Sequence, residues 1–140
     1  MIVLDTNVIS ELMRPQPEPR VLAWADGLDP EAVAITAMNE AEILHGLARL
    51  PDGRRRKQLL ERWEALVVEC FAGRIWPFTS EAAHWYGELL RRRERQARPM
   101  ATADAVIAAT ALAHGVPLAT RDVFDFAGIG LELINPWAVR

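Results

Sequence analysis

Residues 1–10 read MIVLDTNVIS, and the apolar part of this stretch decides the fold class. Ile2, Val3 and Leu4 do not alternate with polar residues, which predicts a short strand buried on both faces of a sheet. Similar strand-like segments follow at residues 32–35, 74–79, 116–120 and 131–134. Strands that alternate with helices form a parallel sheet with helices on both faces. We therefore expect an α/β protein, an α/β/α sandwich with a short parallel central sheet.

Helical patterns fill the stretches between these strands. The expected helices cover residues 7–14, 19–27, 36–50, 54–68, 80–97 and 102–115. Thr36, Ser80 and Thr102 are predicted N-caps, because a hydroxyl oxygen can accept a hydrogen bond from a free backbone N–H of the first turn. The helix after Thr102 is apolar on nearly every face, so it should be buried, and Gly115 should end it. Pro77 lacks a backbone N–H, which predicts an edge or end position in its strand.

The composition of the chain excludes several classes of protein. Its 140 residues suit one domain, which we expect to span 1–140, and 51% hydrophobic with 25% charged residues excludes a disordered or fibrous protein. The net charge of −3 does not indicate a nucleic-acid binder. The first apolar run, MIVL, is too short for a signal peptide or a membrane span. Cys70, the single cysteine, fits a reducing compartment. We expect a cytoplasmic protein that does not bind membranes.

Four acidic side chains on separate segments should meet at one edge of the predicted sheet. They are Asp5 after the first strand, Glu42 on the helix after the second, Asp104 on the apolar helix and Asp122 after the fourth strand. Ligands of parallel sheets bind outside the carboxyl ends of the strands. Two carboxylates about 4 Å apart repel by roughly 4 kcal/mol at an effective dielectric constant near 20, so such a cluster requires a cation.

The type of ligand atom indicates which cation and which reaction to expect. Oxygen ligands favour Mg²⁺ or Mn²⁺, whereas zinc is excluded because no His or Cys pair has the spacing of zinc ligands. A metal-bound water could then attack a phosphodiester, with a carboxylate accepting its proton. Three polar side chains could orient that water or the phosphate, namely those of Thr6, Asn7 and Thr120.

The acidic cluster leaves alternatives open at two of its positions. Glu11 and Glu40 compete with Glu42, although Glu40 stands near a helix start, where an acidic side chain favours the helix dipole. Asp125 competes with Asp122. We favour Asp122, because it lies nearer the end of the strand, and expect Asp125 to be a turn or cap residue next to the core residue Phe126.

Five segments of the chain resemble, in order, the PIN-domain ribonuclease toxins of the VapC group, specifically its FitB-like branch. They are IVLDTNVISELMRP (2–15), AEILHGLARLPDGRRR (41–56), FAGRIWPF (71–78), ADAVIAATALAHGVPLATRDVFDF (103–126) and INPW (134–137). The resemblance implies a PIN fold and a Mg²⁺- or Mn²⁺-dependent endoribonuclease that acts as the toxin of a type II toxin–antitoxin pair. It implies RNA as substrate, a homodimer, and a cognate antitoxin as partner.

The resemblance also assigns roles to individual residues. The metal-binding and catalytic acids would be Asp5, Glu42, Asp104 and Asp122. The hydroxyl of Thr120, or that of Thr6, would support the metal site. The chain departs from the family at residues 39–40, where Asn-Glu stands in place of a commonly apolar residue, and at Arg98, where relatives often have glycine.

A run of arginines offers candidate RNA contacts. We predict that RNA is bound by the residues at the end of the helix expected over 80–97, namely Arg91, Arg92, Arg93 and Arg95. The alternative is a solvated helix face neutralised by nearby glutamates. The five tryptophans, Trp137 of the INPW segment among them, are expected in the core or at a subunit interface.

Two other kinds of protein compete with the nuclease interpretation. A phosphotransfer-type α/β domain also has an aspartate after the first strand. A haloacid dehalogenase needs a second aspartate where this chain has Asn7, and a receiver domain needs a late lysine, whereas Lys57 is the only lysine and lies early. A non-catalytic interaction module would have no reason to bind Mg²⁺ in the millimolar range.

Overall fold

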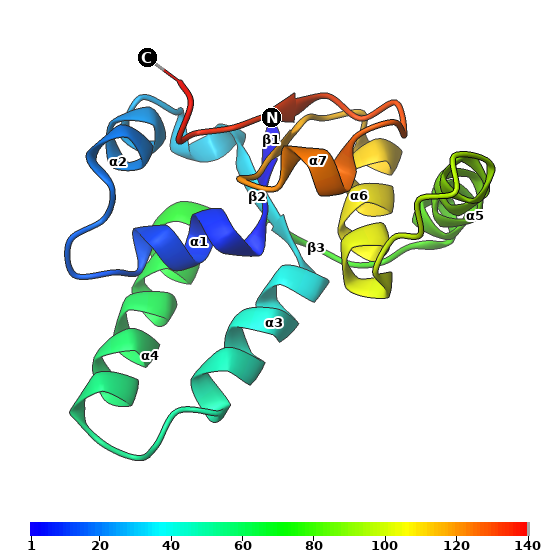
Figure 1. The fold of residues 1–140 in the computed structure, drawn as a ribbon. Coiled ribbons are helices and arrows are strands. Elements are labelled where there is room, and N and C mark those ends of the chain that lie inside the picture. The colour runs from blue at the N-terminus through cyan, green and yellow to red at the C-terminus, as the bar shows by residue number, and fades with distance from the viewer. Residues whose placement is uncertain (140) are drawn as a thin grey trace.

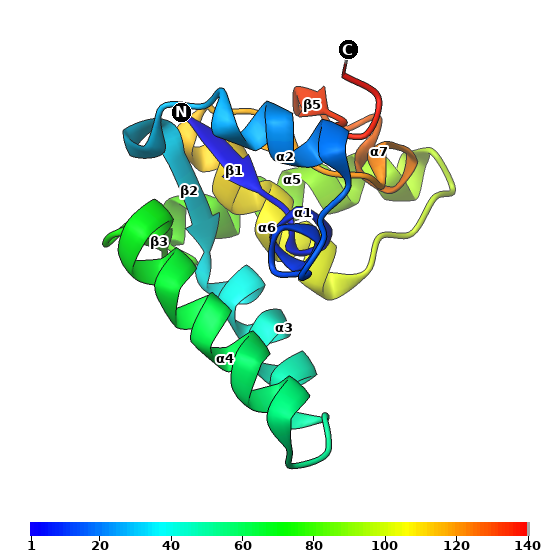
Figure 2. The same cartoon turned by 90° about the vertical axis from the view of Figure 1, so that its left-hand side faces the viewer.

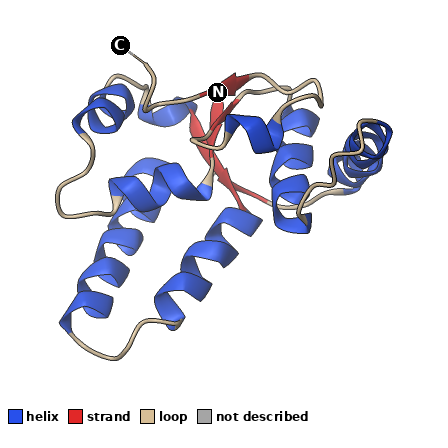
Figure 3. Cartoon of the chain, viewed as in Figure 1, coloured by secondary structure: helices blue, strands red, loops and turns tan. Residues whose placement is uncertain are grey.

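A parallel five-stranded sheet forms the centre of the computed structural model, which describes residues 1–139. Its strands are β1 (Ile2–Leu4), β2 (Val33–Thr36), β3 (Ile75–Trp76), β4 (Leu118–Ala119) and β5 (Leu133–Ile134). They lie in the order β3-β2-β1-β4-β5, and every neighbouring pair is parallel (Figure 1). Figure 3 shows these strands between helices on both sides, which confirms the predicted α/β/α architecture.

Seven α-helices surround the sheet within residues 1–139. They are α1 (Thr6–Leu12), α2 (Pro19–Asp26), α3 (Ala37–Ala48), α4 (Arg54–Leu66), α5 (Ser80–Arg95), α6 (Thr102–His114) and α7 (Val123–Phe126). A 3-10 turn, Pro30–Ala32, precedes β2, and a π-helical turn, Val67–Phe71, follows α4. The six predicted helices are all present, whereas α7 and the π-helical turn were not predicted. None of these helices is long and apolar enough to span a membrane.

Successive residues of β1 face two separate hydrophobic cores. Ile2 and Leu4 belong to the core formed with α1, α2, α3 and α4, whereas Val3 belongs to the core of α5, α6 and α7. Because side chains alternate across a strand, a strand with apolar residues at every position is buried on both faces. This is why the non-alternating run after Met1 correctly predicted the fold class.

One of the three predicted N-caps is confirmed and two are wrong. The Thr36 hydroxyl accepts a hydrogen bond from the Asn39 N–H at 3.1 Å, and the Asn39 side chain accepts one from the Thr36 N–H at 2.9 Å, which is a reciprocal capping box. The backbone of α5 is already helical at Ser80, so Thr79 is its cap, and α6 likewise begins at Thr102 with no side-chain cap.

The predicted ends of two elements are confirmed. Gly115 ends α6 with a φ of 66°, a left-handed conformation that glycine adopts without the strain of a Cβ. The edge strand β3 ends immediately before Pro77.

The fold brings the starts of several helices to one edge of the sheet. The carboxyl ends of β1 and β2 lead directly into α1 and α3, and β4 leads through residues 120–122 into α7. Figures 1 and 2 both show α3 and α4 side by side, projecting away from the sheet. The functional groups predicted from the sequence should therefore lie where these helices begin.

Candidate active site

Asp5 is the buried centre of the site, with only 5% of the residue exposed. Its Oδ1 accepts a hydrogen bond from the Thr6 N–H at 2.8 Å, which caps α1. Its Oδ2 accepts one from the Thr120 hydroxyl at 2.8 Å and one from the Asn7 side-chain amide at 3.3 Å. These neutral donors fix the carboxylate at the end of β1 without cancelling its charge.

Glu42 is held in place through Thr6 by the capping box of α3. The Thr6 hydroxyl donates to Oε1 of Glu42 at 2.6 Å and accepts a hydrogen bond from the Asn39 side-chain amide at 3.0 Å. Asn39 is fully buried, and its carbonyl oxygen is already bonded to Thr36. The start of α3 is thereby connected to Thr6, next to the carboxyl end of β1.

Asp122 joins the site through Asn7. The Asn7 amide donates to Oδ2 of Asp122 at 3.1 Å and contacts the Thr120 hydroxyl at 3.3 Å, and its carbonyl oxygen accepts the Arg121 N–H at 3.2 Å. The Thr120 hydroxyl also accepts the Asp122 N–H at 3.0 Å. Asn7 and Thr120 therefore connect the end of β1 to the segment after β4.

Asp104 enters the site from the first turn of α6. It is half-buried, and no hydrogen bond to its carboxylate is found within residues 1–139. Burial, and then the negative charges of Glu42, Asp125 and Asp122, raise its pKa, against which Arg93 acts weakly. Its oxygens are thus free for a ligand.

All four predicted acids line one cavity of about 530 Å³. The lining is completed by Thr6, Asn7, Ser10, Glu11, Arg14, Arg121 and Trp137. Of the competing acids, Glu11 is bound to Arg14 at 2.9 Å and to the Glu18 N–H at 3.0 Å, so it holds the chain after α1. Asp125 instead lines a small neighbouring cavity with Asp104, and its N–H donates to the Asp122 carbonyl in α7.

Burial and the neighbouring carboxylates disfavour the ionised form of Asp5. Desolvation raises the pKa of Asp5 to about 6, with smaller raising contributions from Asp104 and Glu42 and opposing ones from its Thr120 and Thr6 hydrogen bonds. A cation in the cavity would remove this conflict, because it favours the ionised carboxylates.

The donor set suits a hydrated Mg²⁺ or Mn²⁺ ion. Every candidate ligand is an oxygen atom, and within residues 1–139 no three His, Cys, Asp or Glu side chains are arranged to hold a metal together. Mg²⁺ takes one or two carboxylates and keeps several waters, so it does not require such a group.

Arg93 must be removed from the predicted RNA-binding residues. Only 3% of it is exposed, and its guanidinium donates to the backbone carbonyls of Ala127, at 3.0 Å, Arg98 and Asp125. Burial lowers its pKa, and the charge of Arg98 adds to this. Arg93 therefore connects α5 to α7, while Arg91, Arg92 and Arg95 are exposed but do not line the acidic cavity.

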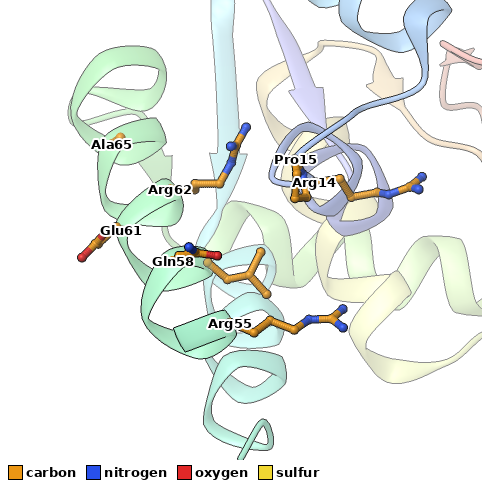
Figure 4. A pocket seen from close by; sticks show the side chains of 8 residues that line it. Arg14, Pro15, Arg55, Gln58, Glu61, Arg62 and Ala65 are labelled. Carbon is orange, nitrogen blue, oxygen red and sulfur yellow. The ribbon is translucent and has the colours of Figure 1, made fainter. Parts of the chain in front are cut away.

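Other arginines lie nearer the acids. Arg14 lines the acidic cavity, a second of about 260 Å³ between α1, α3 and α4, and a third of about 810 Å³ beside α4. Figure 4 shows Arg55 and Arg62 of the third cavity extending from α4 on the side of Arg14, whereas Glu61 points away. The sequence did not single out Arg14, because its position depends on how α1 packs against α3 and α4.

A model of the PIN domain family matches residues 2–127. The chain belongs to the PIN domain family. It is 44% identical over 137 residues to the VapC ribonuclease Y4jK of Sinorhizobium fredii, with 98% of each chain covered. It is 43% identical to Toxin FitB of Neisseria gonorrhoeae, over 98% of this chain and 99% of that protein.

Solved structures agree with this assignment. The crystal structure of FitAcB from Neisseria gonorrhoeae superposes with a TM-score of 0.91 at 42% identity, covering 99% of this chain and 100% of that chain. The structure of FitAB bound to the IR36 DNA fragment superposes with a TM-score of 0.92 at 42% identity, covering 100% and 98%. The resemblance of the sequence to the VapC group and its FitB-like branch is therefore confirmed.

Besides Arg14, two further residues of this PIN-domain site were missed by the sequence analysis. Asn39 was noted only as a departure from relatives, although the spacing of Thr36 and Asn39 is that of a capping box and could have indicated its role. Arg121 stands between two predicted site residues, Thr120 and Asp122, but nothing in its local sequence indicates that its guanidinium faces the cavity.

Proposed function

We propose that this PIN domain, spanning residues 1–140, is a Mg²⁺- or Mn²⁺-dependent endoribonuclease that hydrolyses RNA phosphodiester bonds. The observation that carries the proposal is the convergence of Asp5, Glu42, Asp104 and Asp122 on one cavity, with Asp5 buried. The relatives named as a VapC ribonuclease and a toxin support it.

The four acids would hold the cation, either directly or through its waters. When bound, a divalent cation lowers the pKa of a water that it coordinates to near 7, and it stabilises the charge that develops on the phosphate. Thr6 keeps Glu42 oriented, and Thr120 and Asn7 keep Asp5 and Asp122 oriented, so the chain needs little rearrangement to receive the substrate. One of the carboxylates accepts the proton of the attacking water.

We also propose that the chain is the toxin of a type II pair, acting in the cytoplasm as a homodimer with a cognate antitoxin. Support for the toxin role comes from the relative named Toxin FitB, and support for an antitoxin comes from VapBC-5 of Mycobacterium tuberculosis, a member of the VapBC family of toxin–antitoxin systems that is 26% identical to this chain. Size-exclusion chromatography with light scattering of the purified chain would test the dimer, and a monomeric mass would refute it.

The cleavage proposal is tested by single substitutions in an assay that controls the metal. The purified protein is treated with EDTA, returned to Mg²⁺, and given a fluorescently labelled single-stranded RNA. Asp104→Asn should abolish cleavage, because it removes a ligand and leaves the fold intact. Asp26→Asn, the same change at an exposed position on α2, is the matched control and should cleave like the wild type. Cleavage by Asp104→Asn, or by wild type in EDTA, would refute the proposal.

The exposed arginines at the end of α5 remain proposed RNA contacts. Changing Arg91, Arg92 and Arg95 together to glutamine should lower the slope of log K against log salt by roughly 2, since about 0.7 counterions are released per contact with a single strand. An unchanged slope would make this run a solvated helix face.

A further inference from the structure

Two side chains at the acidic cavity are not used by the proposed reaction. Arg121 and Trp137 both line this cavity together with the four acids. The Arg121 guanidinium carbon lies 5.0 Å from the centre of the Trp137 ring, which is a cation–π arrangement. A guanidinium and an indole beside a phosphodiester-cleaving site could recognise a phosphate and a base.

The site itself fixes the position of Arg121. The backbone N–H of Arg121 donates to the side-chain carbonyl oxygen of Asn7 at 3.2 Å. Arg121 also directly follows Thr120, whose hydroxyl donates to Asp5. Within residues 1–139 no carboxylate lies within 4.0 Å of its guanidinium, whereas Arg14, the other cation lining the cavity, is bound to Glu11. Arg121 is therefore the cation of this cavity whose charge is available to an anionic ligand.

Two hydrogen bonds fix the backbone of Trp137, one at its N–H and one at its carbonyl group. Its N–H donates to the Asn135 side-chain oxygen at 3.0 Å, and its carbonyl accepts from the Arg20 guanidinium at 3.3 Å. Its half-buried indole packs against the core that contains α1 and α2. Figure 1 shows the segment after β5 lying beside α2. A ring held in this way loses little conformational freedom on binding a ligand.

We propose that Arg121 and Trp137 bind one nucleotide of single-stranded RNA next to the scissile phosphate. Arg121 exchanges its contact with the Trp137 ring for a backbone phosphate, and the base stacks on the part of the ring that Arg121 covers in the free protein. The ligand is single-stranded because only an unpaired base can leave its neighbours and stack on a side chain. This subsite deepens the proposed ribonuclease function and rests on it.

The test measures binding without cleavage. Fluorescence anisotropy in EDTA compares a ten-nucleotide oligouridine with an abasic oligonucleotide of the same length and charge. Trp137→Leu, which keeps an apolar side chain against the core, should weaken binding to oligouridine at least about five-fold and leave binding to the abasic strand unchanged. Trp137→Phe should retain most of the affinity. Equal affinity of Trp137→Leu and wild type for oligouridine, or equal loss on both strands, would overturn the proposal.

Arg121 provides a second measurement that does not disturb the core. Arg121→Gln should weaken binding to both strands and lower the slope of log K against log salt by roughly 0.7. An unchanged slope would overturn the phosphate contact. If Trp137→Leu does not fold, the wild type itself decides the base contact, because equal affinity for oligouridine and for the abasic strand would overturn it.

A matched control exists on α7. The Arg98 guanidinium lies 4.3 Å from the ring centre of Phe124, which is 74% exposed and does not line the acidic cavity. Phe124→Leu should bind both strands like the wild type, and a loss equal to that of Trp137→Leu would overturn the assignment to this cavity. The two proposals fail separately. Cleavage of RNA by the wild type in Mg²⁺ tests the proposed function, and binding by Trp137→Leu in EDTA tests this subsite.

Discussion

Replacing Asp5 by asparagine should stabilise the metal-free protein at neutral pH. Burial raises the pKa of Asp5 from 3.8 to about 6. The folded state therefore holds this proton more tightly than the unfolded chain, and stability is lost as the pH rises from about 4 to 6. Raising the pKa from 3.8 to about 6 corresponds to about 3 kcal/mol, by which ionised Asp5 destabilises the folded state at pH 7.5. At pH 4.5 the same shift corresponds to only about 1 kcal/mol.

Urea unfolding in EDTA at these two pH values measures the effect. Asp5→Asn should raise the free energy of unfolding by up to about 3 kcal/mol at pH 7.5 and by about 1 kcal/mol at pH 4.5. Asp26→Asn is the control, because its carboxylate is exposed and the same substitution there should change little at either pH. Adding Mg²⁺ should then stabilise the wild type more than Asp5→Asn, since the cation binds ionised acids.

Two results would refute this reasoning. One is an Asp5→Asn variant no more stable than the wild type at pH 7.5 in EDTA, which would mean that the hydrogen bonds from Thr6 and Thr120 outweigh burial. The other is equal stabilisation of both proteins by Mg²⁺, which would mean that the cation binds elsewhere.

Three further predictions concern the side chains around this centre. Thr6→Val keeps the shape of the side chain but removes its hydroxyl, so it should lower the free energy of unfolding by about 1–2 kcal/mol and also lower kcat. Thr6→Ser should restore both, as measured by urea unfolding and by RNA cleavage. Arg93→Met should lower the free energy of unfolding by about 3 kcal/mol, because three backbone carbonyls lose hydrogen bonds from a buried charged donor, and the prediction fails if the loss stays under about 0.5 kcal/mol. Asp122→Ala should weaken Mg²⁺ binding in calorimetry, whereas Asp125→Ala should leave it unchanged, and the reverse pattern would exchange their roles.

The sequence was sufficient for the fold class because its signals are local. A run of apolar residues without alternation can only be buried on both faces, and the helices between such runs leave few alternatives to a parallel sheet. Asp5 and Asp122 could be predicted for the same reason, since Asp5 directly follows β1 and Asp122 lies in the short segment between β4 and α7. The wrong caps at Ser80 and Thr102 are one-residue errors between adjacent hydroxyl or small residues, where the local sequence is ambiguous.

Residues whose environment depends on packing between distant elements could not be placed from the sequence. Arg93 has exposed arginines on both sides, and its burial follows from the approach of α7 to the end of α5. Glu11 was a candidate ligand from the sequence, but in the structure its carboxylate accepts the Glu18 N–H, which the turn after α1 places beside it. The role of Asn39 requires both the capping box of α3 and its contact with Thr6, 33 positions away.

The charge of the donors around the acids explains how the site can favour a cation. The hydrogen bonds that orient Asp5, Glu42 and Asp122 come from neutral groups, namely hydroxyls, a side-chain amide and a backbone N–H. Arginine or lysine in these positions would have held the carboxylates equally well, but would have neutralised them and lowered their affinity for a metal. The one paired cation of the cavity, Arg14, is bound to Glu11, outside this hydrogen-bonded set. Because the orienting groups are neutral, they fix the geometry of the carboxylates and leave the negative charge of the carboxylates available to the cation.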